Sequence, residues 1–122
     1  MDIIAYRRGI TLFNNSHFYD AHEVLEDVWR AAPEAEKKFL QGLIQIAVAL
    51  HHYSTGNLVG ARSLLQRGTK NLAPYPANFG GMDLARFLKA VAQWSLTLQQ
   101  GGDSPPLPRM ELNNPVLESG SQ

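Results

Sequence analysis

The chain has 122 residues, of which 44% are hydrophobic and 18% charged, and its eleven basic residues balance eleven acidic ones. This length corresponds to one domain, and the scattering of Lys and Arg in ones and twos argues against a nucleic-acid partner. No cysteine is present, which excludes disulfides, thiolate catalysis and cysteine-ligated zinc.

Apolar residues recur at helical spacing along the whole chain, so the sequence predicts an all-α fold. The predicted helices run from Ile3 to Phe13, Phe18 to Arg30, Pro33 to Ser54, Leu58 to Leu72 and Met82 to Gln100. Turn-forming and helix-breaking residues separate them: Asn14-Asn15-Ser16, Pro33, Gly56-Asn57, Pro74 with Pro76, and Gly101-Gly102. The loop APYPANFGG, before the fifth helix, is expected to be a packed connection rather than a lid.

The third predicted helix carries apolar residues around most of its circumference, which indicates a helix surrounded by others. We therefore expect residues 1–100 to form a single helical domain. Residues 101–122, rich in Pro and Gly, are expected to form an extended C-terminal tail.

An internal repeat appears when the sequence is shifted against itself by forty residues. Apolar and small residues then match without a gap: Ile10 falls on Leu50, Ser16 on Gly56 and Ala21 on Ala61. The pattern partly resembles the tetratricopeptide helical hairpin, with Ala21 and Ala61 at close helix crossings. It predicts a five-helix orthogonal bundle of two hairpins and a packing helix; the alternative is a five-helix bundle whose pseudo-symmetry is accidental.

The stretch FYDAHEVLEDVWR places a histidine and four carboxylates on the second predicted helix. The second copy of the repeat lacks them, so the fold itself does not require them. His22, Glu26 and Trp29 share one face of this helix at spacings of four and seven, and Glu23 lies on the neighbouring stripe.

A second polar line crosses the third predicted helix, and its members are Gln41, Gln45 and His52. Because the connection between the two helices is short, we expect them to pack antiparallel, with His22 and Glu26 near the level of Gln45. His22 and Glu26 are expected to be largely buried and bonded to the third helix, above all to Gln45, with Arg30 as the alternative partner. Glu26→Ala would then cost about 1–3 kcal/mol by leaving a buried donor without a partner.

FNNSHFYDAHEVLEDVWR, followed by KFLQGLIQIAVALHHYSTGNLVGARSLL, resembles the domain-of-unknown-function family three hundred and nine. The resemblance covers about Asn14 to Leu72. It implies an orthogonally packed helical bundle of uncharacterised function, with no substrate, cofactor or catalytic residue to transfer. The matching positions are His22, Glu23, Glu26, Trp29, Gly42, Gln45, Gly56, Asn57 and Ala61.

Two functions are compatible with this polar cluster. The favoured one is a ligand- or protein-binding module, in which the cluster forms a hydrogen-bonded network or lines a pocket between the second and third helices. The alternative is a small metal-dependent hydrolase, because His-Glu-x-x-Glu is similar to a zinc-binding motif and His22 with Glu26 could hold one ion. No third ligand has a compelling spacing, so enzyme activity and any cofactor stay undetermined.

The two ends of the chain carry further expectations. MDIIAYRRGI has an early acid and no long apolar core, and FLQGLIQIAVAL is too short for a span of about twenty residues. We therefore expect a cytoplasmic protein without a membrane partner. Leu107, Met110, Leu112, Val116 and Leu117 recur between the tail prolines. They predict that residues 105–117 dock across the helices, or across a neighbouring subunit in a homo-oligomer.

Overall fold

The structure is a computed structural model that describes residues 1–113. Its elements are α1 (Ile3–Asn14), α2 (Phe18–Ala31), α3 (Glu34–Ser54), α4 (Leu58–Leu72), the 3-10 helix η1 (Phe79–Gly81) and α5 (Leu84–Gln100). The described residues contain no β-strand, so the expected all-α class with five helices is confirmed. None of these helices has both the length and the apolar character needed to span a bilayer.

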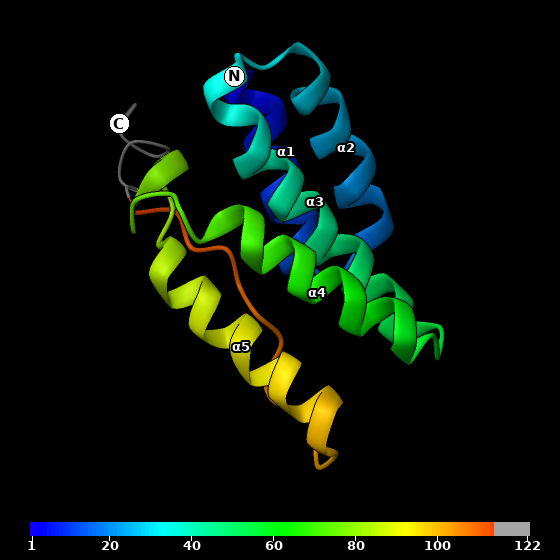
Figure 1. Ribbon diagram of the computed structural model, residues 1–122. Helices are drawn as coiled ribbons and strands as arrows, with labels where there is room; N and C mark the ends of the chain where they lie inside the picture. Colours follow the sequence, from blue (N-terminus) through cyan, green and yellow to red (C-terminus); the bar gives the residue numbers. More distant parts are fainter. Residues whose placement is uncertain (114–122) are drawn as a thin grey trace, which may run out of the picture.

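Each helix packs against the next one along the chain. In Figure 1, α2 and α3 lie side by side with α1 behind them, α4 crosses in front of α3, and α5 lies beyond α4. As predicted, α3 is the central helix. Its buried residues are Phe39, Leu40, Gly42, Leu43, Ile46, Ala47, Ala49 and Leu50.

The turns of the two hairpins have the same backbone conformation forty residues apart. Ser16 and Gly56 both have positive φ, 66° and 85°, and each turn therefore reverses at the same position. The amide of Ser16 donates to the carbonyl of Phe13 over 2.9 Å, and that of Gly56 to Tyr53 over 3.1 Å. The repeat predicted from the sequence is thus confirmed at both turns, and Ala21 and Ala61 are both buried.

The fifth helix begins two residues later than predicted. Asp83 is its N-cap, and its carboxylate accepts a bond from the amide of Arg86 over 3.1 Å. Met82 has extended backbone and forms an antiparallel bridge with Leu112 instead. The expected start at Met82 is therefore wrong, because the capping aspartate fixes the first helical residue at Leu84.

The loop between α4 and α5 is a packed connection, as expected. The rings of Tyr75 and Phe79 lie 5.7 and 4.9 Å from the ring of Phe39, measured between centroids. Tyr75 donates its hydroxyl to the carbonyl of Ala35 over 3.0 Å. These contacts hold the loop against the start of α3.

The segment after α5 returns along that helix in the opposite direction, as the orange trace in Figure 1 shows. The indole N–H of Trp94 donates to the carbonyl of Pro106 over 2.9 Å. The side-chain amide of Asn14 makes two bonds to the backbone of Met110, at 3.0 and 2.9 Å. The tail therefore links α5 to α1.

The docking prediction holds for residues 105–113. Met110 is only 1% exposed, whereas Leu107 keeps 45% of its surface exposed. Val116 and Leu117 lie outside the described residues. Where the structure describes it, the tail lies on its own chain.

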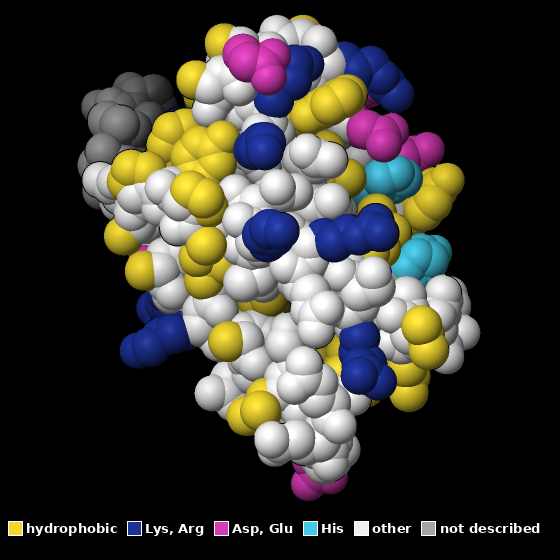
Figure 2. All heavy atoms as spheres, in the orientation of Figure 1, with side chains coloured by type: hydrophobic (Ala, Val, Ile, Leu, Met, Phe, Trp, Pro, Cys, Tyr) yellow, Lys and Arg dark blue, Asp and Glu magenta, His cyan; other side chains and the backbone are white. Residues whose placement is uncertain are grey.

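The charged side chains are distributed unevenly over the surface. Figure 2 shows Lys and Arg across the face formed by α4, with Asp and Glu mainly at the margins of the view. The exposed cations of α4 are Arg62, Arg67 and Lys70, and this helix contains no carboxylate. The exposed carboxylates of α2 lie on the other side of α3.

Candidate functional site

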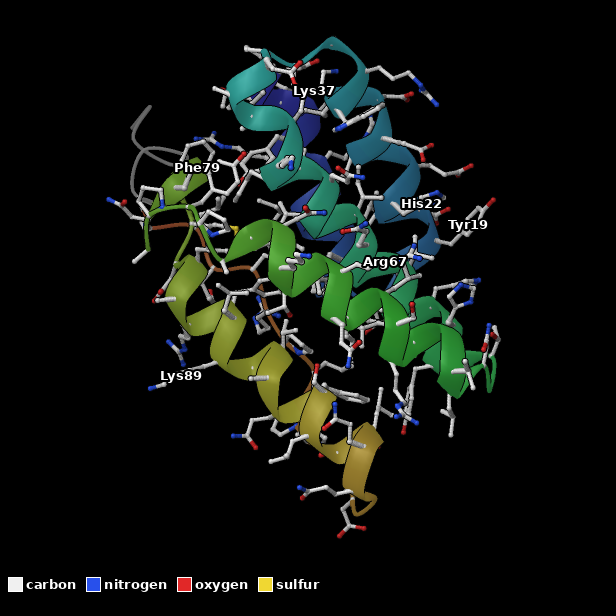
Figure 3. All side chains as sticks on the ribbon, viewed as in Figure 1. Tyr19, His22, Lys37, Arg67, Phe79 and Lys89 are labelled. Carbon is white, nitrogen blue, oxygen red and sulfur yellow. The ribbon has the colours of Figure 1, made fainter. Side chains whose placement is uncertain are left out.

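The pairing of α2 with α3 positions the candidate site. A two-residue connection, Ala32-Pro33, reverses the chain between them. Lys37, in the first turns of α3, donates its ammonium group to the carbonyls of Trp29 and Arg30, and it lies 4.4 Å from the centroid of the Trp29 ring. This cation therefore binds both the ring and the C-terminal carbonyls of α2. Figure 3 shows Lys37 at the connected end of the pair, and Tyr19 and His22 further along α2.

A hollow of about 320 Å³ lies between α2 and α3. We call it the α2–α3 hollow, and its lining residues are Glu26, Trp29, Arg30, Gln41, Ile44 and Gln45. Four of the seven residues predicted from the sequence are among them, drawn from both polar lines. The expected meeting of these two lines therefore takes place at this hollow.

His22 and Glu26 are less buried than expected, and neither is bonded to Gln45. The side chain of Glu26 is 42% exposed, with one oxygen 3.4 Å from the guanidinium of Arg30 and the other 3.9 Å from Nε2 of His22. The imidazole donates Nδ1–H to the carbonyl of Tyr19 over 2.9 Å. The predicted bond to Gln45 is thus wrong, and Glu26 pairs with the alternative partner Arg30, because α2 supplies its own partners one turn away.

Gln45 has a different partner from the one predicted. Its side-chain oxygen accepts a bond from the amide of Asn71 on α4, at 2.8 Å. The amide of Gln45 therefore spans the distance between the α2–α3 hollow and α4, and its oxygen is already used.

Three predicted residues do not line the hollow. Glu23 is exposed on the outer face of α2. His22 lies beside the ring of Tyr19, 4.9 Å between centroids. His52 lies near the end of α3, with Nδ1 3.5 Å from the amide of Asn57.

Sequence reasoning missed the contribution of Ile44 and the role of Lys37. Ile44 adds an apolar wall beside the two glutamines, and it stands three residues after Gln41 on the same face. Lys37 follows Trp29 by eight residues across the short connection. That spacing, in an antiparallel pair, is the signal that could have indicated the contact.

The indole of Trp29 carries a polar group without a protein partner. Its N–H is buried and makes no hydrogen bond within the described residues. A buried donor without an acceptor costs about 1–3 kcal/mol, so the position of this indole lowers the stability of the fold locally. Trp29 therefore contributes its ring, rather than its N–H, to the wall of the hollow.

The metal alternative has no support from the geometry of the site. Among residues 1–113, no three His, Asp or Glu side chains are placed to hold one ion. His22 and Glu26 lie close together, but a catalytic zinc needs three protein ligands.

Comparison with known proteins finds a family model that matches the part of the chain forming this hollow. The family model "Domain of unknown function (DUF309)" matches residues 6–64. These residues are similar in sequence to the DUF309 family. The matched DUF309 segment contains α2, α3 and all six lining residues of the hollow, whereas α5 and the tail lie outside it.

Two curated relatives are similar to this chain in sequence. An uncharacterised protein of Aquifex aeolicus (strain VF5) is 34% identical over 96 residues, which cover 78% of this chain and 28% of the relative. The uncharacterised protein YpuF of Bacillus subtilis (strain 168) is 36% identical over 56 residues, which cover 45% of this chain and 32% of the relative. The aligned part thus spans less than a third of either relative's length.

Proposed function

We propose that this chain is a binding module and that the α2–α3 hollow receives a small organic molecule. The observation that carries the proposal is the convergence of Glu26, Trp29, Gln41 and Gln45 on one hollow. These residues come from two helices. The second copy of the repeat has Gln66 in the place of Glu26, so the fold does not require a carboxylate there.

The size and the walls of the hollow support this use. A volume near 320 Å³ is at the lower end of the range of about 300–1,000 Å³ for small-molecule sites. Ile44 and the ring of Trp29 offer apolar surface, while the glutamines and Arg30 offer polar groups that can orient a ligand. Lys37 fixes the Trp29 end of α2, so that this wall is preformed.

Nuclear magnetic resonance of the full-length chain tests the proposal. A panel of small water-soluble compounds carrying acid, amide, alcohol or amine groups is added to ¹⁵N-labelled protein. We expect at least one compound to shift, saturably, the Trp29 indole resonance and the backbone amides of residues 26–30 and 41–45. Trp29→Phe distinguishes the Trp29 indole signal from that of Trp94.

Gln41→Phe tests whether binding depends on the hollow and should abolish it. Gln41 is exposed at the edge of the hollow, so a larger ring there can fill the hollow without entering the core. Lys38→Phe puts the same ring at an exposed position of α3 outside the hollow and serves as the control. If no compound in the panel shifts these resonances, or if Gln41→Phe binds as well as Lys38→Phe, the proposal fails.

A further inference from the structure

The helices α4 and α5 carry positive charge and no negative charge. The charged residues within Leu58–Leu72 and Leu84–Gln100 are all exposed cations, namely Arg62, Arg67, Lys70, Arg86 and Lys89. None of these five residues takes part in an ion pair within residues 1–113. The two helices therefore present unused positive charge, although the chain as a whole is neutral.

A hollow of about 440 Å³ lies between these two helices, and we call it the α4–α5 hollow. In Figure 1, α4 and α5 diverge from the loop that connects them. The side chains of Ala92 and Ser95 on α5 are short, so they leave space against α4. Gln66 and Lys70 line the hollow from α4, and Leu96 lines it from α5.

The lining combines an apolar side with a cationic side. Leu96 keeps 48% of its surface exposed beside the hollow. On α4, Arg62, Gln66 and Lys70 follow each other at spacings of four residues and therefore share one face of the helix. Arg67 is off this line and does not line the hollow, and Figure 3 shows it on the side of α4 away from α5.

We propose that the α4–α5 hollow binds an acidic amphipathic helix of a protein partner. Apolar side chains of this helix would contact Leu96 and Ala92, and its carboxylates would pair with Arg62 and Lys70. These two cations are eight residues apart, which is about 12 Å along α4. Two carboxylates separated by two turns of a partner helix span nearly the same distance, about 11 Å.

The lining favours an acidic protein segment over a polyphosphate. A nucleic acid is held mainly by many cations that contact its phosphates, whereas this chain has as many acidic as basic residues. An amphipathic helix in a groove uses apolar contacts together with ion pairs. It therefore matches both the exposed leucine and the line of cations, and a phosphate backbone matches only the cations.

This surface is separate from the site of the proposed function. The α4–α5 hollow shares no lining residue with the α2–α3 hollow. Its lining residues also lie outside residues 6–64, which the DUF309 model matches. Binding at the two hollows can therefore be tested independently, and failure at one leaves the other in place.

Two synthetic helical peptides test the partner class on the ¹⁵N-labelled full-length chain. The first is a capped peptide of alanine and glutamine that carries two glutamates two turns apart, with leucines between them on the same face. The second has glutamines in place of the glutamates. We expect the glutamate peptide to shift the backbone amides of residues 66–70 and 92–99 saturably, and the glutamine peptide to bind more weakly. Added salt should reduce this difference, because it screens exposed charges.

Charge variants of α4 test the pairing. Arg62→Gln combined with Lys70→Gln should weaken binding of the glutamate peptide about threefold to tenfold, and should leave the glutamine peptide unchanged. Arg67→Gln removes the same charge from α4 outside the hollow, and it should change the affinity by less than about twofold. All three side chains are exposed, so we expect the variants to keep the fold.

A filling variant of α5 tests the position. Ala92 is exposed in the α4–α5 hollow, so Ala92→Phe should occupy the space and abolish peptide binding. Gln93→Phe puts the same ring at the next exposed position, which faces the tail rather than α4, and serves as the control. Equal binding by these two variants would place the peptide elsewhere and overturn the inference.

The remaining outcomes decide the class of partner. If both peptides bind equally, or neither shifts these amides, the acidic-helix inference fails. It also fails if an oligothymidylate or phosphatidylglycerol vesicles shift or broaden the same amides at lower concentration than the glutamate peptide does. In that case the cations of α4 serve a phosphate-bearing surface instead.

Discussion

Tyr6 is a buried phenol whose hydroxyl bonds the loop between α4 and α5. It donates to the carbonyl of Gly80 over 2.8 Å and is 1% exposed. Gly80 has a φ of 70°, and a Cβ there would lie 2.7 Å from the Tyr6 hydroxyl. A larger residue at position 80 would therefore collide with Tyr6. Burial, reinforced by the negative charge of Glu36, raises the pKa of Tyr6 above its ordinary value near 10.

This pKa shift makes stability depend on alkaline pH. Below pH 10 the phenol is neutral in both states; above it, the unfolded chain loses the proton while the folded chain keeps it. The free energy of unfolding should then fall by about 1.4 kcal/mol per pH unit from this group. The melting temperature should therefore fall more steeply between pH 8 and about pH 11 for the natural chain than for Tyr6→Phe. Parallel profiles for the two proteins would contradict the assignment.

Glu26 contributes little to stability because its side chain is partly exposed. Its carboxylate is 42% exposed and pairs with Arg30, which is still more exposed. Glu26→Ala should therefore lower the free energy of unfolding by less than about 1 kcal/mol, rather than by the larger amount expected for a buried network. Leu25→Ala, at a fully buried neighbour, should cost about 2–5 kcal/mol in the same urea titration. If Glu26→Ala lowers the free energy of unfolding as much as Leu25→Ala does, Glu26 belongs to a buried network after all.

At the scale of the helices, α3 and α4 approach closely at a pair of glycines. A Cβ on Gly68 would lie 3.0 Å from the carbonyl oxygen of Gly42 and 2.6 Å from Ile46, and a Cβ on Gly42 would lie 3.1 Å from the carbonyl oxygen of Gly68. The nearest atoms are side-chain carbons of Ile46 and Leu72, and the facing backbone carbonyl oxygens lie only slightly further away. The second hairpin therefore depends on small residues at its crossing.

Gly68→Ala decides whether helix propensity or packing dominates here. Alanine favours an isolated helix by about 1 kcal/mol, but its methyl group would overlap the Ile46 side chain and press on the carbonyl oxygen of Gly42. We expect a net destabilisation of about 1–3 kcal/mol by urea unfolding. Ser63→Ala, on the exposed face of α4, should change stability by less than about 0.5 kcal/mol. Stabilisation by Gly68→Ala would show that the crossing can relax.

At the scale of the whole molecule, the tail completes the core. Met110 is 1% exposed, and its backbone is held by Asn14 of α1. Met110→Ala should cost about 2–5 kcal/mol, like other large-to-small core changes. Leu107→Ala, three residues earlier and 45% exposed, should leave the melting temperature nearly unchanged. Equal effects at the two positions would mean that the tail does not pack as described.

The sequence by itself determined the helices and their order. Apolar spacing predicted all five helices, and Pro33, Gly56 and Gly101 marked boundaries, because helix periodicity and breaking residues are local properties of the chain. The repeat also located equivalent turns at Ser16 and Gly56, because turn-forming residues are a local property of the chain. The short connection also predicted that the polar lines of α2 and α3 would meet.

Only the tertiary structure decided which polar groups became partners. Glu26 could bond Arg30 on its own helix or Gln45 on the next, and Gln45 could bond Glu26 or Asn71; sequence spacing allows each choice. In the structure Gln45 bonds Asn71 of α4, and Glu26 lies 3.4 Å from the guanidinium of Arg30 on its own helix. The unpaired indole of Trp29 followed from the same packing, since a hydrogen-bond partner depends on distances of a few ångströms between elements that the sequence does not specify.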